Sequence, residues 1–474
     1  MKPLTAAQVA ELVEAQIVGD PSVLIGPEVI IDSRKVSPGC LFVALPGERV
    51  DGHDFVPAVL AAGAAAALVS RPLDAAGTML VVADPTAALA ALGTAVVRSA
   101  VDDGLVTVGI TGSSGKTSTK DLLAQILDAA GPTVAPAGSQ NNEIGVPLTA
   151  TRVGADTRFL VSEFGARGIG HVSWLCGVVP PQIGVVVNVG QAHLGEFGDV
   201  ATIARAKAEL VEALPSDGWA VLNAEDALVS AMAARTSARI ATFALGAEPT
   251  FGELRVWSEQ AESDDRLRYR FVVHAAGAVV GTAPVSLQVS GAHQVSNALA
   301  ALTAALTVGL DLESAAAAVS RAEAKSRWRM ELHDLPDGGL IINDAYNANP
   351  DSMAAALQSL AGLRRPSGRL VAILGDMLEL GPDTAARHRQ VGELAAELGV
   401  DVLIAVGQQA SDLAAGAAGT GLMATQVADA AAAEQAALSM VRPGDVVLVK
   451  ASRGLALEAV AQRLVDGAGA ESER

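Results

Sequence analysis

The sequence predicts an α/β protein with three domains, of which the second and third each hold a mostly parallel sheet. The chain has 474 residues, too many for one ordinary hydrophobic core. Short apolar stretches alternate with segments of helical periodicity along most of its length, as expected when helices cross between parallel strands. The alternation changes at residues 253–290, where strand-like stretches follow one another too closely for intervening helices. We therefore place the domains at residues 1–103, 104–325 and 326–474.

The first domain is predicted to be a small α/β unit. Apolar strands at 41–45 and 79–83 alternate with alanine-rich helical segments. Near the N-terminus, Thr5 and Gln8 have the spacing of a helix capping box, and acidic residues interrupt the apolar positions that a signal peptide would need. The apolar run at 55–70 is shorter than the roughly 20 residues of a membrane span, so we interpret it as a buried helix.

The composition limits the partners. A formal net charge of −19 disfavours nucleic acid and anionic membrane surfaces, because both repel an acidic protein. Cys40 and Cys176 are the only cysteines, too few for a disulfide framework or a cysteine metal site. We expect a cytoplasmic protein without stable membrane insertion, whose small-molecule partners are bound by a few placed cations and helix N-termini.

A strand, a glycine-rich loop and a helix open the second domain. Residues 106–110 form a short apolar strand, and residues 116–130 carry leucine and isoleucine on one helical face. The loop between them contains Gly112-Ser-Ser-Gly115-Lys-Thr, which lacks the first glycine of the common G-x-x-x-x-G-K-[ST] pattern. Backbone N–H groups at such a helix start bind anions, Lys116 can reach the terminal phosphates, and Thr117 can coordinate magnesium. A chance glycine-rich turn is the alternative, which the strand and helix around the loop disfavour.

The remaining strands complete two sheets. In the second domain we expect strands at 158–163, 183–189 and 220–223, then an antiparallel edge or small side sheet at 253–290 and a helix at 294–308. In the third domain, strands at 339–343, 370–374, 402–406 and 446–450 alternate with helices, which predicts a doubly wound, Rossmann-like fold. No G-x-G-x-x-G follows a strand there, so we assign no dinucleotide to it.

Polar residues end several of these strands, and in open α/β sheets the ligand binds beyond the carboxyl ends of the strands. They are Glu163, Asn188, His193, Asp344 and Lys450. A carboxylate such as Glu163, in the same sheet as a phosphate loop, is well placed to bind magnesium, although it could instead cap a turn. His193 is equally consistent with a structural hydrogen bond. The pattern alone indicates a magnesium-dependent nucleoside triphosphatase.

Two further polar residues lie on predicted helices. Lys207 falls in a helix predicted at 201–214, where a solvated lysine is the ordinary expectation. Asn297 lies near the start of the helix at 294–308 and is equally consistent with an ordinary polar residue at a helix start. The pattern by itself assigns no role to either residue.

Several segments together resemble the Mur ligase family across nearly the whole chain. They are DSRKVSPG at 32–39, LFVALPGERVDGHDF at 41–55, TGSSGKTSTK at 111–120, QNNEIGVPLT at 140–149, SEFGARGIGH at 162–171, DAYNANPDSM at 344–353, LGDMLELG at 374–381 and VKASRGLALE at 449–458. The shortened glycine loop is that family's own form of the phosphate loop. The combination of DAYNANPDSM with LGDMLELG points to the member that adds D-alanyl-D-alanine to UDP-N-acetylmuramoyl-tripeptide.

The resemblance implies amide-bond formation in two steps. ATP phosphorylates the terminal carboxylate of the UDP-linked tripeptide to an acyl phosphate, and the amine of D-alanyl-D-alanine attacks it through a tetrahedral intermediate. A carboxylate needs this activation because its leaving group would otherwise be oxide. Electrostatic stabilisation should then supply most of the catalysis.

Residue-by-residue matching implies the following ligands. The nucleotide would be held by Gly112, Ser113, Ser114, Gly115, Lys116, Thr117, Ser118, Asn297, Arg329 and Asp344. Magnesium would be held by Thr117, Glu163, His193 and Lys207, the lysine as a carbamate. Ser33 and Arg34 match the UDP-sugar site of the first domain, Asn141 and Asn142 lie near the muramoyl peptide, and Asn347 and Asn349 are candidates for the acceptor dipeptide. The catalytic residues would be Lys116, Lys207, His193 and Arg329. The residue before Arg329 is Trp328, where the family usually has glycine.

Three other functions compete with this interpretation. A sister ligase would add a third amino acid such as diaminopimelate, and a folylpolyglutamate synthase would lack the N-terminal DSRKVSPG and DGHDF segments. A regulatory ATP-binding switch would have little need for Glu163, His193 and Lys207 together. We expect a monomeric enzyme that uses ATP and magnesium.

Overall fold

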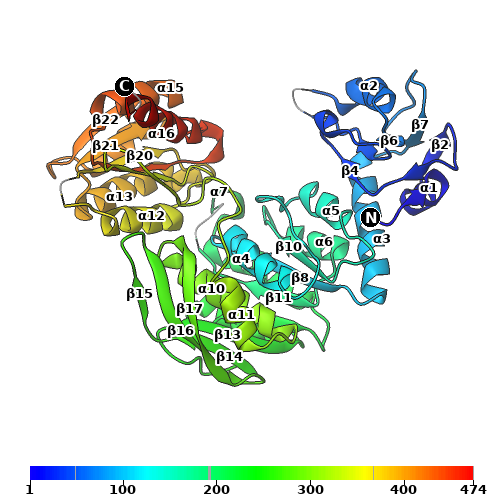
Figure 1. Ribbon diagram of the computed structural model, residues 1–474, viewed down its shortest axis with the longest axis horizontal. Coiled ribbons are helices and arrows are strands. Elements are labelled where there is room, and N and C mark those ends of the chain that lie inside the picture. Colours follow the sequence, from blue (N-terminus) through cyan, green and yellow to red (C-terminus); the bar gives the residue numbers. More distant parts are fainter. Residues whose placement is uncertain (48–49, 191–193, 367, 473–474) are drawn as a thin grey trace.

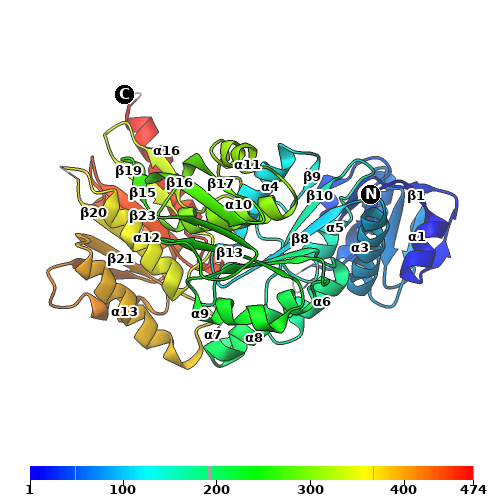
Figure 2. The same ribbon diagram turned by 90° about the horizontal axis from the view of Figure 1, so that it is seen from below.

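The computed structural model describes residues 1–47, 50–190, 194–366 and 368–472. Three main sheets lie in an N-terminal unit (1–102), a central unit (106–319) and a C-terminal unit (331–472). The N-terminal unit, in blue, and the C-terminal unit, in orange and red, lie at opposite ends of the central unit (Figure 1), and the view from below agrees (Figure 2). Among the described residues, no helix has the length and apolar character needed to cross a membrane.

The N-terminal unit holds a five-stranded sheet. Its order is β2 (Gln16–Val18), β7 (Thr78–Val81), β6 (Ala66–Val69), β5 (Leu41–Val43) and β4 (Val29–Ile30), with only β2 antiparallel. A small ladder joins β1 (Leu4–Thr5) to β3 (Leu24–Ile25). Helix α1 (Ala6–Val13) begins at the predicted capping box of Thr5 and Gln8, which confirms that prediction. Helix α3 (Pro85–Asp102) leads into the central unit.

The prediction of one helix over residues 55–70 is wrong. Helix α2 covers only Val56–Ala61, and β6 follows as a fully buried strand inside the sheet. Gly63, with φ +106°, lies between them in a conformation that ends a helix. Alanine favours helices in isolation, but burial between strands on both sides overrides this weak preference.

The central unit is built on one ten-stranded sheet. Parallel strands β9 (Thr133–Val134), β10 (Phe159–Glu163), β8 (Val106–Thr111), β11 (Ile183–Val186), β12 (Trp219–Asn223), β13 (Arg239–Leu245) and β14 (Leu254–Ser258) lie side by side. The antiparallel strands expected at 253–290 are present as β15 (Ala261–Ser263), β16 (Arg268–Gly277) and β17 (Gly281–Ser290), and they continue the edge of this sheet beyond β14.

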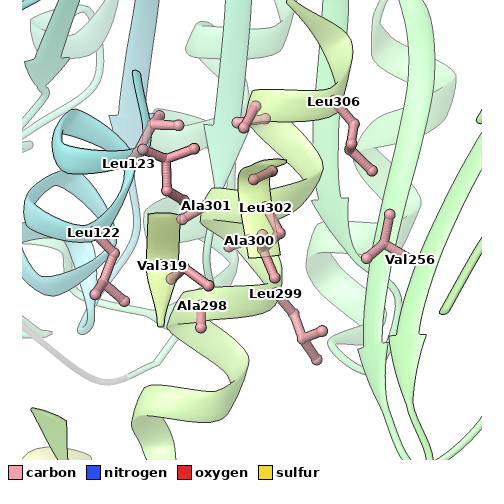
Figure 3. Close-up of a cluster of buried hydrophobic side chains, with 14 of the residues drawn as sticks. Leu122, Leu123, Val256, Ala298, Leu299, Ala300, Ala301, Leu302, Leu306 and Val319 are labelled. Atoms are coloured by element: carbon pink, nitrogen blue, oxygen red, sulfur yellow. The ribbon is translucent and has the colours of Figure 1, made fainter. Parts of the chain in front are cut away.

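Helices cover both faces of the central sheet. One face packs against α4 (Lys116–Asp128), α10 (His293–Thr307) and α11 (Leu312–Val319), and the other against α3, α5 (Gly145–Ala150), α6 (His171–Val178) and α8 (Val200–Glu212). Short helices α7 (Leu194–Phe197) and α9 (Ala227–Ser230) lie in the connections. Alanines along α10 let it pack closely against Leu122 and Leu123 of α4 and Val256 of the sheet (Figure 3). This packing places the N-terminal ends of α4 and α10 next to each other.

The C-terminal unit is doubly wound, as predicted. Its six strands run in the order β18 (Glu331–Asp334), β19 (Leu340–Asn343), β23 (Val446–Lys450), β20 (Leu370–Gly375), β21 (Val402–Val406) and β22 (Met423–Val427), and only β18 is antiparallel. Helices α12 (Pro350–Gly362), α13 (Thr384–Glu397) and α14 (Ala410–Gly416) pack on one face, and α15 (Ala430–Met440) and α16 (Glu458–Ser472) on the other.

Besides the connecting chain, the contacts between the central and C-terminal units include the following two. At the tip of the β15–β16 hairpin, Leu267 packs into the apolar core of the C-terminal unit, and neighbouring Arg266 pairs with Asp334 of β18. At the other place, Gly195 of α7 donates its backbone N–H to the Glu379 carbonyl at 2.9 Å. A Cβ on Gly195 would lie 2.6 Å from the backbone nitrogen of Gly381, so the two backbones can meet only without a side chain there.

Candidate active site

The glycine loop joins β8 to α4, as the sequence predicts. Gly115 is the N-cap of α4 with φ +78°, and a Cβ there would lie 2.4 Å from Oδ1 of Asn297. Both the backbone angle and the close approach of Asn297 therefore require glycine. The N–H groups of the first turn of α4 have no intrahelical acceptors, so this end of the helix suits an anion.

Asn188, at the carboxyl end of the strand next to β8, fixes the loop. Its Oδ1 accepts the backbone N–H groups of Ser113 and Ser114, both at 3.0 Å. Lys116 folds back over the loop and donates to the Gly112 carbonyl at 2.6 Å. Burial lowers the pKa of Lys116, while Glu163 raises it and Arg329 lowers it further. Its ammonium thus lies inside the loop, where a phosphate would provide the missing negative charge.

Beside the loop lies a cluster of oxygen ligands. The Thr117 hydroxyl donates to Oε2 of Glu163 at 2.8 Å and lies 2.6 Å from the Ser139 hydroxyl. Oε1 of Glu163 accepts from Asn141 at 2.7 Å. Hydroxyl and carboxylate oxygens are the ligands that Mg²⁺ prefers, and Mg²⁺ usually keeps several waters or phosphate oxygens besides one or two carboxylates. His193 lies outside the described residues. Within those residues, no group of three or more His, Cys, Asp or Glu is arranged to hold a metal.

Lys207 lies inside this site rather than on the surface. It is on α8, and only 4% of it is exposed. Burial lowers its pKa well below the ordinary value, and the positive charge of Lys116 lowers it further. Among the described residues, its amine has no hydrogen-bond or ion-pair partner, so no described group offsets the cost of burying its charge.

The C-terminal unit, together with the segment at 320–330 that leads into it, supplies the opposite wall. Arg329 reaches across to the Ser139 hydroxyl at 2.7 Å, and its guanidinium lies 4.2 Å from the centre of the Tyr346 ring. Asp344 accepts the backbone N–H of Met330 at 3.1 Å and pairs with Lys450 at 2.6 Å. The same ammonium donates to the Asn347 carbonyl at 2.9 Å, so the 344–349 loop folds around a buried lysine.

Residues of both walls line one cavity of about 560 Å³. Its lining contains most of the predicted site residues: Ser113, Ser114, Gly115, Lys116, Thr117, Ser118, Asn141, Asn142, Glu163, Lys207, Asn297, Arg329, Asp344, Asn347 and Asn349. Gly112 does not line the cavity, but its carbonyl accepts the hydrogen bond from Lys116. The buried Nε of Arg329 has no hydrogen-bond partner, which fits an anionic ligand such as a nucleotide phosphate. The residues present therefore fit ATP, and the oxygens of Thr117 and Glu163 could hold magnesium.

Two of the asparagines that were predicted to bind substrate also build local structure. Asn142 accepts the backbone N–H of Gly145 at 2.9 Å, at the start of α5. Asn349 is the N-cap of α12 and accepts the backbone N–H of Ser352 at 2.9 Å. Because the oxygen makes the capping bond, the side-chain amino group of each asparagine remains a potential donor.

Ser33 and Arg34 are not part of this cavity. They lie in a short 3-10 turn of the N-terminal unit, and the Arg34 side chain is 87% exposed. The Arg34 side chain makes two hydrogen bonds to Asp32, at 2.9 and 2.8 Å, and its backbone N–H makes a third at 3.1 Å. These bonds lower the pKa of Asp32 to about 2. A ligand that touched both places would have to be long.

The sequence patterns missed several cavity residues, including Ser139, His293, Gln294 and Tyr346. His293 and Gln294 precede Asn297 by four and three residues on α10, so helical spacing could have placed them on the same face. Burial lowers the pKa of His293, with Asp344 opposing and Lys450 adding to the shift. Ser139 lies in an irregular loop and carries no comparable signal.

Comparisons with known proteins agree with this architecture. Residues 110–305 match the family model "Mur ligase middle domain", residues 328–453 match "Mur ligase, glutamate ligase domain", and residues 28–108 match "Mur ligase family, catalytic domain". Together these models cover most of the chain.

Curated relatives match along nearly their whole length. The UDP-N-acetylmuramoyl-tripeptide--D-alanyl-D-alanine ligase of Mycobacterium bovis is 44% identical over 98% of each chain. The Escherichia coli protein of the same name is 36% identical over 98% of this chain and 99% of its own.

Solved structures give the same result. MurF from Acinetobacter baumannii superposes with a TM-score of 0.85 at 32% identity, covering 98% of this chain and 99% of that one. MurF ligase from Thermotoga maritima, solved in complex with ADP, gives a TM-score of 0.75 at 25% identity, covering 94% of this chain and 98% of that one.

Proposed function

Because the chain belongs to the Mur ligase family, we propose that it joins D-alanyl-D-alanine to UDP-N-acetylmuramoyl-tripeptide, with conversion of ATP to ADP and phosphate. The observation that carries the proposal is the full-length match to ligases of that name, combined with a phosphate loop facing the C-terminal unit across one cavity. The product would be the UDP-linked pentapeptide used in peptidoglycan synthesis.

A sister ligase that adds the third amino acid is less well supported. The solved UDP-N-acetylmuramoyl-L-alanyl-D-glutamate--2,6-diaminopimelate ligase superposes with a TM-score of 0.52 at 18% identity, a likeness of fold alone. The curated relatives that match this chain at 44% and 36% identity all act, by name, on the tripeptide and the dipeptide.

The arrangement of cations suits activation of a carboxylate by phosphoryl transfer. Lys116 and Arg329 approach the same place from two units, so both would neutralise charge on the transferring phosphoryl group. The tripeptide carboxylate becomes an acyl phosphate, and phosphate leaves after the dipeptide amine has attacked through a tetrahedral intermediate. We infer that Asn297 lies near adenine and that Asp344 contacts the nucleotide from the C-terminal unit.

We further propose that Thr117, Glu163 and His193 hold magnesium, which would supply charge neutralisation between phosphate oxygens. The oxygen cluster around Thr117 and Glu163 supports the first two assignments, while His193 rests on the family resemblance alone. Titration of the ligand-free protein with Mn²⁺, followed by electron paramagnetic resonance, tests the site without an activity assay. A Glu163→Gln variant should bind Mn²⁺ more weakly than the parent.

We propose that Lys207 carries a carbamate, which would be a further anionic ligand of magnesium. Its burial and the lack of a partner for its amine support this, because a neutral amine can add carbon dioxide. The carbamate should give a ¹³C resonance in protein equilibrated with ¹³C-bicarbonate, and Lys207→Ala should lack it. Short carboxylic acids should partly restore activity to that variant, since they can occupy the vacated position.

The substrate sites complete the proposal. Ser33 and Arg34 would bind the UDP-sugar on the N-terminal unit, with Asn141 and Asn142 near the peptide at the cavity and Asn347 and Asn349 near the acceptor. The UDP-linked tripeptide would then have to reach from the N-terminal unit to the cavity. We also propose that the protein works as a monomer in the cytoplasm.

An ADP-release assay with single omissions tests the function. ADP should form rapidly only when ATP, UDP-N-acetylmuramoyl-tripeptide and D-alanyl-D-alanine are all present. Activity with the UDP-linked dipeptide and diaminopimelate would identify the sister ligase instead. ADP release that ignores both peptides would indicate a nucleotide-dependent switch.

A further inference from the structure

Trp328 has an unusual backbone conformation at the border of the cavity. Its φ is +60°, in the left-handed region that side-chain-bearing residues rarely adopt. Two contacts hold it there: its carbonyl accepts the Tyr346 N–H at 3.2 Å, and its ring lies under the Arg453 guanidinium at 4.3 Å. A strained residue kept in place by its surroundings is a reason to look for a function in what it supports.

The residue it supports is Arg453, in the short turn after β23. Arg453 lines the cavity together with Ser452 and Gly454. Its Nη1 lies 2.5 Å from Oε1 of Glu458, and its side chain is 50% exposed. Within the described part of the chain, Nε and Nη2 have no hydrogen-bond partner. Stacking fixes the plane of the guanidinium, and Glu458 binds one end of it, so the remaining N–H groups form a preorganised anion site.

The other cations of the cavity have different roles. Lys116 lies in the phosphate loop, and Arg329 bonds to Ser139 beside it. Lys450 is occupied by Asp344 and the Asn347 carbonyl. Arg329 also keeps an unbonded Nε, but it bonds to Ser139 beside the phosphate loop. Arg453 is therefore the second cation of the C-terminal wall that keeps donors available within the described residues.

We propose that Arg453 receives the free carboxylate of the acceptor dipeptide, and that Trp328 is the positioning residue that holds it. This inference rests on the proposed function. The acceptor is a zwitterion whose amine must face the activated carbonyl, so its carboxylate needs a separate partner on the acceptor side. Arg453 offers the planar pair of N–H groups that binds a carboxylate in bidentate fashion. It thereby selects acceptors with a free C-terminus.

The test compares D-alanyl-D-alanine with its C-terminal amide, which keeps the nucleophilic amine but lacks the carboxylate. Wild type should show a KM for the amide about 10- to 100-fold above that for the acid. Arg453→Met should raise the KM for the acid by a similar factor, leave the KM values for ATP and UDP-tripeptide nearly unchanged, and bring the amide-to-acid ratio close to one. Arg453→Lys should fall between them, because it keeps the charge but loses the bidentate geometry.

Two further variants separate positioning from general damage. Trp328→Leu removes the ring and should raise the KM for the acid by a few-fold. Trp328→Phe keeps an aromatic ring, so its KM for the acid should stay close to that of wild type. Arg463→Met is the matched control, since Arg463 lies on α16 with 55% exposure and pairs only with Glu434 at 3.4 Å in the described residues. Its kinetics should match wild type.

Each other outcome has a definite meaning. An unchanged amide-to-acid ratio in Arg453→Met, with wild type active on the dipeptide, overturns the assignment while the ligase function stands. A rise in the KM for UDP-tripeptide instead of the dipeptide also overturns it, because Arg453 would then face the acyl substrate. A wild type that uses neither form of the dipeptide overturns the proposed function and this assignment together.

Discussion

The two walls of the cavity follow the same topological rule but differ in how their charges are paired. Both lie at the carboxyl ends of parallel strands, β8 and β10 on one side and β19 and β23 on the other. On the central wall, Lys116 donates only to carbonyls of its own loop, and Lys207 has no partner among the described residues. On the C-terminal wall, Lys450 is paired with Asp344.

This difference indicates a division of labour. The central wall also holds Glu163, but neither of its two lysines forms an ion pair in the described residues. Its unpaired lysines favour a negatively charged ligand, so this wall should provide most of the phosphate affinity. On the C-terminal wall, Lys450 and Arg453 each have a carboxylate partner, while Nε of Arg329 has no partner in the described residues. A wall with most of its cations paired holds a more fixed shape and should act mainly by orienting what it touches. Substitutions on the two walls should therefore have different kinetic signatures.

The largest effect is expected at Lys116. Lys116→Ala removes the cation from the phosphate loop and should lower kcat/KM by about 10³-fold or more. Thermal unfolding without ligands should stay close to wild type, because little apolar area is lost. Lys325→Ala is the matched control, since Lys325 is 58% exposed and 3.7 Å from Glu323. Near wild-type turnover of Lys116→Ala would contradict the assignment of this loop as the phosphate-binding site.

Arg329 lies on the C-terminal wall, so its substitution should lower kcat without weakening the binding of UDP-tripeptide. Arg329→Ala should lower kcat by about 10- to 100-fold, because the charge that crosses from the C-terminal unit is lost. Binding of UDP-tripeptide, measured by calorimetry, should stay nearly unchanged, since Ser33 and Arg34 lie on another unit. The exposed neighbour Arg327 serves as control in Arg327→Ala. Equal losses of tripeptide affinity and turnover would contradict the division between the walls.

A smaller effect is expected where the walls meet. Gly195→Ala should force the backbones of Gly195 and Gly381 apart and lower turnover by about tenfold, because a shift of about 1 Å disturbs the alignment of reacting groups. Small-angle scattering with substrates should give a larger radius of gyration than wild type. Gly177→Ala is the control, since a Cβ there meets no atom within 4 Å. Identical behaviour of the two variants would mean that this contact does not govern approach of the walls.

The smallest expected effect concerns stability. Lys207→Met should stabilise the ligand-free protein by about 1–3 kcal/mol at neutral pH in bicarbonate-free buffer, because a buried amine without a partner is removed. Folding lowers the pKa of Lys207, so the unfolded chain binds a proton that the folded chain does not. The loss of folding stability caused by Lys207 is complete at pH values below the pKa of Lys207 in the folded protein. This loss disappears as the pH rises towards 10.5, the ordinary pKa of lysine. The gain from Lys207→Met, measured by denaturant unfolding, should shrink over that range; a constant gain would indicate a charged lysine.

Local patterns explain what the sequence predicted well. The strand, glycine loop and helix at 106–128 depend on neighbouring residues, so spacing was sufficient to find them. The polar residues Glu163 and Asp344 could be placed because parallel strands end at a common edge. The doubly wound C-terminal sheet followed from the alternation of strands and helices.

Features that depend on distant residues were not predictable. The burial of Lys207 depends on how α8 packs beside the phosphate loop, and no pattern within that helix distinguishes it from a solvated lysine. Strand β6 was mistaken for helix because alanine carries little strand signal and the neighbouring strands decide. The pairing of Lys450 with Asp344 joins residues 106 positions apart.

The central claim is that the two walls meet over one carboxylate, which ATP activates before the acceptor attacks. UDP-N-acetylmuramoyl-tripeptide labelled with ¹⁸O in its terminal carboxylate tests this most directly, with mass spectrometry of the phosphate and the pentapeptide. If an acyl phosphate forms, one labelled oxygen leaves with phosphate and the other stays in the new amide carbonyl. Phosphate without ¹⁸O, formed while the pentapeptide accumulates, would contradict the account.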